Sequence, residues 1–210
     1  MKKIFFLGLL VLLLAQMVQA QEQIEVPIWN VGDRWVFTQG IKVGVIGADE
    51  NNYVVEYPNQ TVLYAKSTLN RVYSLQGGEK RESSKESLRR LFDFPLTIGK
   101  NWKDTYLAQL KWEDIYTAKP GSFSLGDETQ MFESYKVIRW EDVKIRAGSF
   151  KAIKVEYKRK RRTSASGMRE GRMWYWYSPE VKNLIKVQYD KSQMWSKETN
   201  WKLISFQLVK

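Results

Sequence analysis

The sequence predicts an all-β fold: a single strongly curved antiparallel sheet or open barrel with one short helical or loop segment. Short runs of β-branched and aromatic residues recur from Trp35 to the C-terminus, and such runs are typical of strands. Turn dipeptides such as Asn51–Asn52 and Gly77–Gly78 separate the runs. The gaps are too short for crossover helices, so consecutive strands should pair antiparallel.

The N-terminus has the pattern of a secretory signal peptide. A pair of lysines precedes the apolar run Ile4–Leu14, and Val18–Ala20 forms a small-residue cleavage site. The apolar run is shorter than the ~20 residues that span a bilayer. We therefore predict a cleaved signal peptide over 1–20, one all-β domain over 21–210, and a soluble periplasmic or extracellular product.

The predicted strands form two groups on either side of a polar middle. In the second group, residues that face one way are apolar and their neighbours are charged, which is typical of half-buried strands. The first group comprises Trp35–Phe37, Ile41–Ile46, Tyr53–Tyr57, Thr61–Ala65 and Arg71–Leu75, and the second comprises Val137–Ile145, Phe150–Lys160, Met168–Tyr177, Leu184–Tyr189 and Trp201–Val209.

The polar middle, Glu79–Leu91, is rich in Lys, Arg, Glu and Ser. We predict that it is a short helix or a polar loop lying across or beside the sheet. Leu88, Leu91 and Phe92 have the i, i+3, i+4 spacing of one helical face, and Pro95 would end a helix there.

Two glycines precede tryptophans at the same spacing: Gly32 before Trp35, and Gly99 before Trp102. Each pair predicts a turn that leads into a strand. The glycine takes a positive φ angle, and the tryptophan three residues later packs over the core.

Three motifs follow one another in the C-terminal two-thirds of the chain: Phe94–Trp102 (FPLTIGKNW), Glu141–Ala152 (EDVKIRAGSFKA) and Trp176–Lys186 (WYSPEVKNLIK). Together they resemble the TapB-like family of secreted bacterial proteins of unknown function. The resemblance implies an all-β protein and a kinship with the LolA and LolB lipoprotein-carrier superfamily, in which a curved antiparallel sheet holds acyl chains. It implies no catalytic residues.

Two positions in these motifs predict turns. Gly148 suits the left-handed position of a three-residue hairpin loop between Val137–Ile145 and Phe150–Tyr157. Asn183 stands where the family has glycine. Asparagine tolerates the left-handed conformation better than other non-glycine residues, so we predict that the turn is kept.

The chain has no histidine and no cysteine. This excludes Ser-His-Asp and Cys-His nucleophiles, histidine-ligated zinc and disulfides. The adjacent acids Glu113/Asp114 and Glu141/Asp142 remain as candidates for a glycosidase pair, but neighbours on a strand point to opposite faces. No Asp-rich calcium loop is present. We therefore expect a non-enzyme without catalytic residues, metal or cofactor.

The formal net charge is +11, and the densest basic run comprises Lys158, Arg159, Lys160, Arg161 and Arg162. Two interpretations stay open for this run. It contacts an anionic membrane surface, or it is a charged hairpin end that discourages edge pairing. No aromatic residues interleave the run, so we expect no nucleic-acid partner.

Four consecutive aromatic residues, Trp174, Tyr175, Trp176 and Tyr177, place an aromatic pair on each face of a strand. One pair belongs to the core, and the other needs a partner. That partner is either a covering segment of the chain or an apolar ligand inside the curved sheet.

These observations predict a non-enzymatic secreted or periplasmic envelope protein. In this hypothesis the sheet concavity binds an apolar or amphiphilic ligand such as a lipid, and the basic run lies near anionic headgroups. Two alternatives are a surface or interaction protein with a filled core and no ligand, and a carboxylate-dependent carbohydrate-active enzyme. An open concave face favours the carrier, and a filled one favours the interaction protein.

Overall fold

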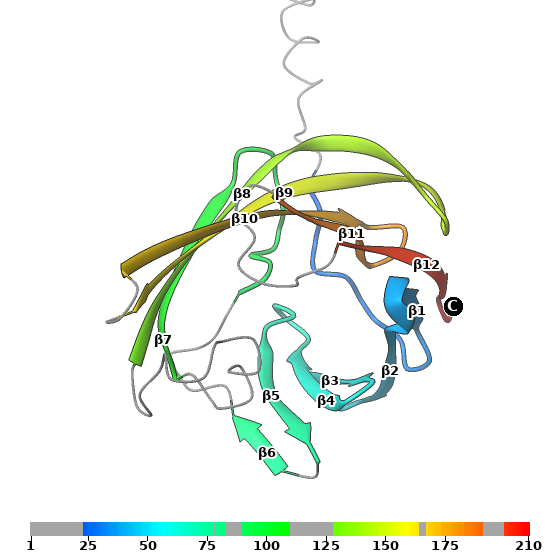
Figure 1. Ribbon diagram of the computed structural model, residues 1–210. Helices are drawn as coiled ribbons and strands as arrows, with labels where there is room; N and C mark the ends of the chain where they lie inside the picture. Colours follow the sequence, from blue (N-terminus) through cyan, green and yellow to red (C-terminus); the bar gives the residue numbers. More distant parts are fainter. Residues whose placement is uncertain (1–22, 78, 83–89, 110–127, 164–166, 191–199) are drawn as a thin grey trace, which may run out of the picture.

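Twelve strands join into one antiparallel sheet (Figure 1). The computed structural model describes residues 23–77, 79–82, 90–109, 128–163, 167–190 and 200–210. The hydrogen-bonded order is β6-β5-β4-β3-β2-β1-β12-β11-β10-β9-β8-β7. The strands are β1 (Arg34–Phe37), β2 (Lys42–Ala48), β3 (Asn52–Tyr57), β4 (Gln60–Ala65), β5 (Arg71–Gln76), β6 (Glu79–Glu82), β7 (Asn101–Gln109), β8 (Glu128–Ile145), β9 (Gly148–Thr163), β10 (Gly167–Ser178), β11 (Asn183–Tyr189) and β12 (Trp201–Gln207).

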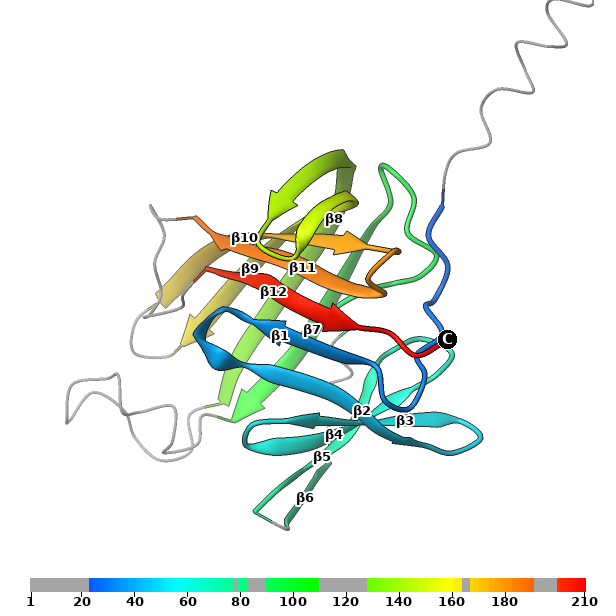
Figure 2. The ribbon, with the colours of Figure 1, turned by 90° about the vertical axis from the view of Figure 1, so that its right-hand side faces the viewer.

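The sheet is strongly curved and open. It curls so that its edge strands, β6 and β7, come to the same side of the molecule (Figure 1). Figure 2 shows β12 between β1 and β11, where it joins strands β1 to β6 to strands β7 to β11. The pairing of β12 with β11 is short, with Lys186 opposite Lys202 and Val187 opposite Trp201. This architecture confirms the predicted all-β fold.

The polar middle differs from the prediction in its first residues. Glu79–Glu82 forms strand β6, which pairs with β5 around a turn at Gly77. The backbone pairing outweighs the polar composition because an edge strand can expose both faces to water. Leu91 and Phe92 lie in irregular chain, and Leu88 lies outside the described residues.

Two apolar clusters form the core. In the first, residues of β7 to β11 pack with Phe92, Leu96 and Ile24. In the second, β1 to β3 and β12 pack with the connected end of the β8–β9 hairpin. Ile24 and Leu96 join through an isolated backbone bridge, which attaches the N-terminal segment to the segment before β7. Trp201 contacts both clusters.

The two glycine-tryptophan turns use the same backbone device. The Gly32 N–H donates to the Val45 carbonyl, 2.8 Å away, and the Val45 N–H donates back to Asp33. The Gly99 N–H likewise donates to the Val137 carbonyl, 3.0 Å away, and the Val137 N–H donates back to the carbonyl of the next residue, Lys100.

Both glycines have the positive φ angles that such turns require, 101° at Gly32 and 86° at Gly99. The tryptophans that follow are buried, and each caps a backbone carbonyl with its indole N–H. Trp35 donates to Val181 over 2.9 Å, and Trp102 donates to Arg90 over 3.0 Å.

The other two expected turns lie at the ends of β8 and β10. Gly148 begins β9 and pairs with Ile145 across the two-residue turn of Arg146 and Ala147. Its φ angle of 144° lies outside the left-handed helical region, so the predicted three-residue loop is replaced by a shorter turn. In the turn before β11 the left-handed residue is Lys182, with φ 57°, rather than Asn183. Asn183 instead opens the strand, where its side-chain oxygen accepts the Leu184 N–H over 2.7 Å. The turn therefore survives by moving the positive φ angle one residue earlier.

No helical segment in the part of the chain that the structure describes has the length and apolarity of a membrane-crossing helix. The predicted signal peptide, residues 1–20, lies outside that part.

Candidate functional site

Strand β10 divides its four aromatic residues between the two clusters. Tyr175 and Tyr177 belong to the first cluster. Trp176 belongs to the second cluster, and Trp174 packs against it. The four side chains therefore do not line one common surface. Only the two tyrosines face the inside of the curved sheet together with the core of β7 to β10.

The Tyr177 end of this inner face is filled by the protein itself. The ring centroids of Phe92 and Phe94 lie 5.3 and 5.7 Å from that of Tyr177. Tyr177 is 1% exposed, and its hydroxyl has no hydrogen-bond partner among the described residues. Burial raises the pKa of this phenol well above its usual value. The covering segment before β7 is thus the partner of this side chain.

Farther along the inner face, aromatic rings form a continuous ladder across four strands. Trp102 of β7 stacks on Tyr135 of β8 with centroids 5.0 Å apart and an interplanar angle of 6°. Tyr157 of β9 lies 4.9 Å from Tyr135 and 5.8 Å from Tyr175 of β10. Ring pairs of this kind stabilise a fold by about 0.5–1.5 kcal/mol each. We call Trp102, Tyr135, Tyr157 and Tyr175 the aromatic ladder.

One carboxylate is buried within the ladder. Glu133 of β8 is 2% exposed. Its oxygens accept the Tyr135 hydroxyl over 2.7 Å and the Tyr157 hydroxyl over 2.5 Å. A buried carboxylate is costly unless hydrogen bonds compensate for its lost hydration, and the two phenols supply such bonds. The inner face is therefore an aromatic surface with a strongly polar point at Glu133, and Arg159 lies opposite Glu133 on the same face.

A second phenol pair lies on β3 and β4, on the other side of the curved sheet. The Tyr57 and Tyr64 hydroxyls are 2.8 Å apart. Burial raises the pKa of both phenols, and the charge of nearby Arg71 opposes this effect without overcoming it. Arg71 also contacts the buried hydroxyl of Ser74. Internally paired hydroxyl groups on aromatic rings therefore occur in both clusters: Tyr135 and Tyr157 belong to the first, and Tyr57 and Tyr64 pack against the second.

The opposite face of β10 carries a carboxylate and cations around Trp176. The Trp176 indole N–H donates to Glu141 Oε2 over 2.7 Å, and Lys154 Nζ and Arg139 lie 3.2 and 2.6 Å from Glu141 Oε1. Burial alone would raise the pKa of Glu141. The hydrogen bonds from Trp176 and Lys154 and the positive charge of Lys154 outweigh it and lower that pKa.

The adjacent acids do not form a glycosidase site in the described residues. Asp142 is exposed, while Glu141 is partly buried in its own ion pairs, so the two neighbours point apart. Glu113 and Asp114 lie outside the described residues. Within the described ranges, no group of three or more acidic residues is gathered closely enough to hold a metal ion.

The basic run lies on β9, and its charges are partly neutralised. Lys158 pairs with Glu156 over 3.1 Å, and Lys160 pairs with Glu170 over 2.5 Å. Arg159 lies on the face of β9 that Lys158 and Lys160 do not share, and it pairs with Glu133 in the register. The side chains of Arg161 and Arg162 lie outside the description.

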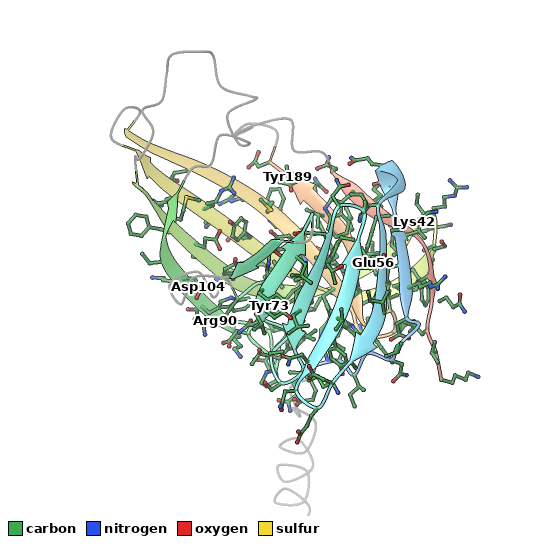
Figure 3. All side chains as sticks on the ribbon, turned by 90° about the horizontal axis from the view of Figure 1, so that it is seen from below. Lys42, Glu56, Tyr73, Arg90, Asp104 and Tyr189 are labelled. Atoms are coloured by element: carbon green, nitrogen blue, oxygen red, sulfur yellow. The ribbon has the colours of Figure 1, made fainter. Side chains whose placement is uncertain are left out.

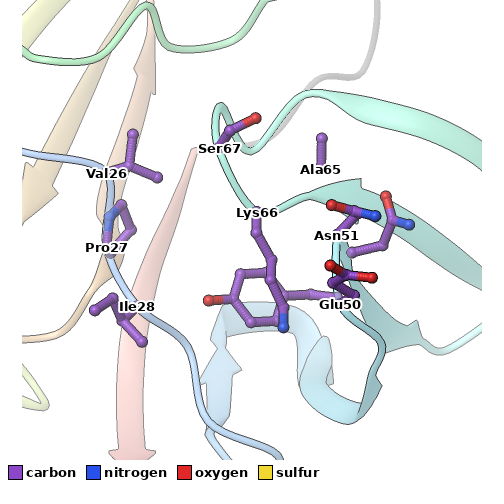
Figure 4. Close-up of a pocket in the computed structure, with 10 residues that line it drawn as sticks. Val26, Pro27, Ile28, Glu50, Asn51, Ala65, Lys66 and Ser67 are labelled. Atoms are coloured by element: carbon purple, nitrogen blue, oxygen red, sulfur yellow. The ribbon is translucent and has the colours of Figure 1, made fainter.

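A surface pocket of about 540 Å³ lies between the N-terminal segment and the β3–β4 end (Figure 4). Two of its polar side chains already have partners, because Asn52 donates to the Asp49 carboxylate over 3.1 Å and Lys66 contacts the same residue. Lys66 Nζ donates to the Asp49 carbonyl over 2.5 Å and lies 5.3 Å from the Tyr53 ring centroid. The apolar rim includes Ile28, which is 72% exposed.

At the β7 edge, Arg90 and Asp104 form an ion pair of 3.0 Å (Figure 3). Because the Arg90 carbonyl also accepts the Trp102 indole N–H, this ion pair holds the first ring of the aromatic ladder in place.

The chain is similar to three solved structures, each covering 89% of it. A lipoprotein candidate from Parabacteroides distasonis is 18% identical, with a TM-score of 0.42 and all of its own chain covered. The hypothetical lipoprotein YmcC from Escherichia coli is 9% identical, with a TM-score of 0.45 and 90% covered. A candidate exported protein with a YmcC-like fold from Bacteroides fragilis is 12% identical, with a TM-score of 0.38 and all of its chain covered.

These TM-scores are too low to carry an argument about function. No protein-family model and no curated protein matches the chain. The TapB-like resemblance and the kinship with lipoprotein carriers therefore stay predictions.

Sequence reasoning missed the ladder and its carboxylate. Glu133 and Tyr135 lie in the first half of β8, before the predicted strand Val137–Ile145 begins. The available signal was the alternation of Met131, Glu133, Tyr135 and Val137, which continues the apolar parity of that strand backward. A glutamate within that alternation obscured it.

Proposed function

We propose that this protein is a non-enzymatic exported envelope protein that binds an amphiphilic molecule against the inner face of its curved sheet. The buried Glu133 within the aromatic ladder is the observation that carries the proposal. Ligand sites are mostly apolar and aromatic, with a few placed polar groups that orient the ligand. The ladder supplies the apolar surface, and the carboxylate with its two phenols supplies the polar point.

The composition of the inner face supports an adaptable site. Met131 and Met173 flank the ladder and are buried. Methionine side chains adjust to irregular ligand shapes, which suits acyl chains of varying length. Tyr175 donates to the Met173 sulfur over 2.9 Å, so even this methionine is held in a defined position at rest.

Native mass spectrometry and lipid extraction of the full chain, purified without detergent from its own host, test the proposal. We expect an added mass that organic extraction removes. Tyr157→Phe keeps the ring and deletes one hydroxyl bonded to Glu133, so it should lower the bound fraction. Tyr57→Phe is the matched control, because it deletes a buried phenol bond on the other side of the sheet. A wild-type protein that carries no extractable molecule contradicts the proposal.

One observation favours a second candidate function. Phe92 and Phe94 fill the Tyr177 end of the inner face, as expected for a surface or interaction protein with a filled core. A clean apo mass together with capture of one defined protein partner supports this alternative instead.

A further inference from the structure

A row of four cationic residues and one tryptophan crosses five neighbouring strands on the face opposite the aromatic ladder. In the register, Arg139 of β8 lies opposite Lys154 of β9, and Lys154 lies opposite Trp176 of β10. Trp176 lies opposite Lys186 of β11, and Lys186 lies opposite Lys202 of β12. We call these five residues the lysine row.

The charges of the lysine row are balanced at one end only. Glu141 forms ion pairs with Arg139 and Lys154 at 2.6 and 3.2 Å. In the described part of the chain, no acidic oxygen lies within 4.0 Å of the ammonium group of Lys186 or Lys202. Among the described residues, the β11–β12 end of the row therefore holds two adjacent cations without a direct ion pair.

This arrangement is unfavourable in the unliganded protein. Like charges directly opposite each other on neighbouring strands destabilise a sheet. Burial and the neighbouring charges of Lys202 and Lys154 lower the pKa of Lys186, and the negative charge of Glu141 opposes this effect without overcoming it. The Lys186 ammonium lies 4.0 Å from the Trp176 ring centroid, and this cation–π contact offsets part of the cost.

The geometry suits one small anion. Directly opposed residues have Cβ atoms about 4.5–5.5 Å apart, so both lysine side chains can reach a single group. Lys202 is exposed and Lys186 is partly exposed, so solvent reaches both. Trp174, two residues before Trp176 on the same strand face, is partly exposed and lies beside the row.

We propose that Lys186 and Lys202 form a binding site for a phosphate group. A phosphate monoester carries close to two negative charges at neutral pH and several acceptor oxygens. It can therefore neutralise both ammonium groups, whereas a carboxylate neutralises one. The partly exposed Trp174 beside the row is placed to contact the apolar part of a phosphorylated molecule. The site lies on the other face of the sheet from Glu133, so it does not depend on amphiphile binding there.

Calorimetric titration with inorganic phosphate in a low-salt, phosphate-free buffer tests the site. Lys186→Gln and Lys202→Gln should each weaken phosphate binding about tenfold or more, because each removes a charge-assisted hydrogen bond. Lys42→Gln is the matched control: an exposed strand lysine outside the row, which should bind as the wild type does.

Thermal unfolding distinguishes a binding role from a structural one. Phosphate should raise the melting temperature of the wild type and of Lys42→Gln, but not of Lys186→Gln. Without phosphate, Lys186→Gln should be at least as stable as the wild type because it relieves repulsion, so it remains folded for the comparison. No phosphate effect on the wild type, or an equal effect on all variants, overturns the proposal.

Flotation with phosphatidylcholine vesicles, with and without phosphatidic acid, identifies the source of the phosphate. Binding only to vesicles with phosphatidic acid, lost in Lys186→Gln, assigns the site to a lipid headgroup. Binding of inorganic phosphate without binding to either vesicle assigns it to a soluble phosphorylated molecule. Either result supports the site, provided that inorganic phosphate binds the wild type in the titration.

Discussion

The Glu141 carboxylate joins three neighbouring strands through side chains. It accepts hydrogen bonds from Trp176 and Lys154 and pairs with Arg139. These contacts favour the charged form and lower the pKa of Glu141 against the opposing effect of burial. A carboxylate whose pKa is lower in the folded state stabilises the fold above its unfolded pKa, and the stabilisation disappears as the pH falls through the folded pKa.

Glu141→Gln should therefore lower the free energy of unfolding by about 1–2 kcal/mol at neutral pH. The difference from the wild type should shrink as the pH falls below the usual glutamate value of 4.5. Urea denaturation at a series of pH values measures it. The exposed Asp142→Asn is the control and should show little effect at neutral pH, while a constant deficit for Glu141→Gln at all pH values contradicts the charge argument.

Among the secondary-structure elements, the same glycine-tryptophan turn precedes both β1 and β7. It opens β1 and β7 with the same pair of backbone hydrogen bonds to a buried valine, and it buries the following tryptophan. A Cβ atom added at Gly32 would lie 2.9 Å from the Val209 side chain. This turn therefore needs glycine both for its φ angle and for the close approach of the C-terminal segment.

Gly32→Ala should destabilise the protein by about 2 kcal/mol, through backbone strain and this close contact. Gly44→Ala on β2 is a matched control, because its added Cβ would meet only ordinary contacts, at 3.6 Å and beyond. We expect Gly44→Ala to change the free energy of unfolding by less than about 0.5 kcal/mol. Chemical denaturation of both variants measures the two values, and equal stabilities would refute the role of the turn.

Most strands could be predicted from the sequence because their alternation matches the burial in the sheet. β3 to β5 and β9 to β11 lie close to the predicted ranges. β6 was missed because its polar residues give no apolar periodicity, and its pairing depends on the turn at Gly77. β8 begins nine residues earlier than predicted, at Glu128 rather than Val137, because its first half contains the buried Glu133.

At the scale of the whole molecule, Asp33 joins the beginning of the sheet to the C-terminal segment. It is fully buried, and its oxygens accept the Asn30 N–H over 2.9 Å and the Val209 N–H over 2.8 Å. Lys182, in the turn between β10 and β11, places its Nζ 3.9 Å from Asp33 Oδ2. One carboxylate thus connects segments that are far apart along the chain.

Asp33→Ala should cost about 2–3 kcal/mol of stability, because it leaves backbone donors without their acceptor. The exposed Asp142→Ala is the control and should change stability little. Hydrogen exchange should show faster exchange at Val209 in Asp33→Ala, since its amide loses its acceptor. Unchanged exchange at that amide would argue against the connecting role.

The fold class, the strands with clear alternation and the division of the β10 aromatics between two faces could all be predicted from the amino-acid sequence. These properties follow from the two-residue period of a strand, which is local. The sequence also excluded histidine and cysteine chemistry through composition alone.

Which side chains meet depends on the packing of the whole sheet. The aromatic ladder combines residues from four strands and the lysine row residues from five, while Glu133 is bonded from β8 and β9, and such contacts depend on register and curvature across the sheet. The partner of Tyr177 likewise depends on tertiary packing, because Phe92 and Phe94 of the segment before β7 cover its ring. Local periodicity gives the face that a side chain occupies, whereas the packing of distant strands gives its neighbours.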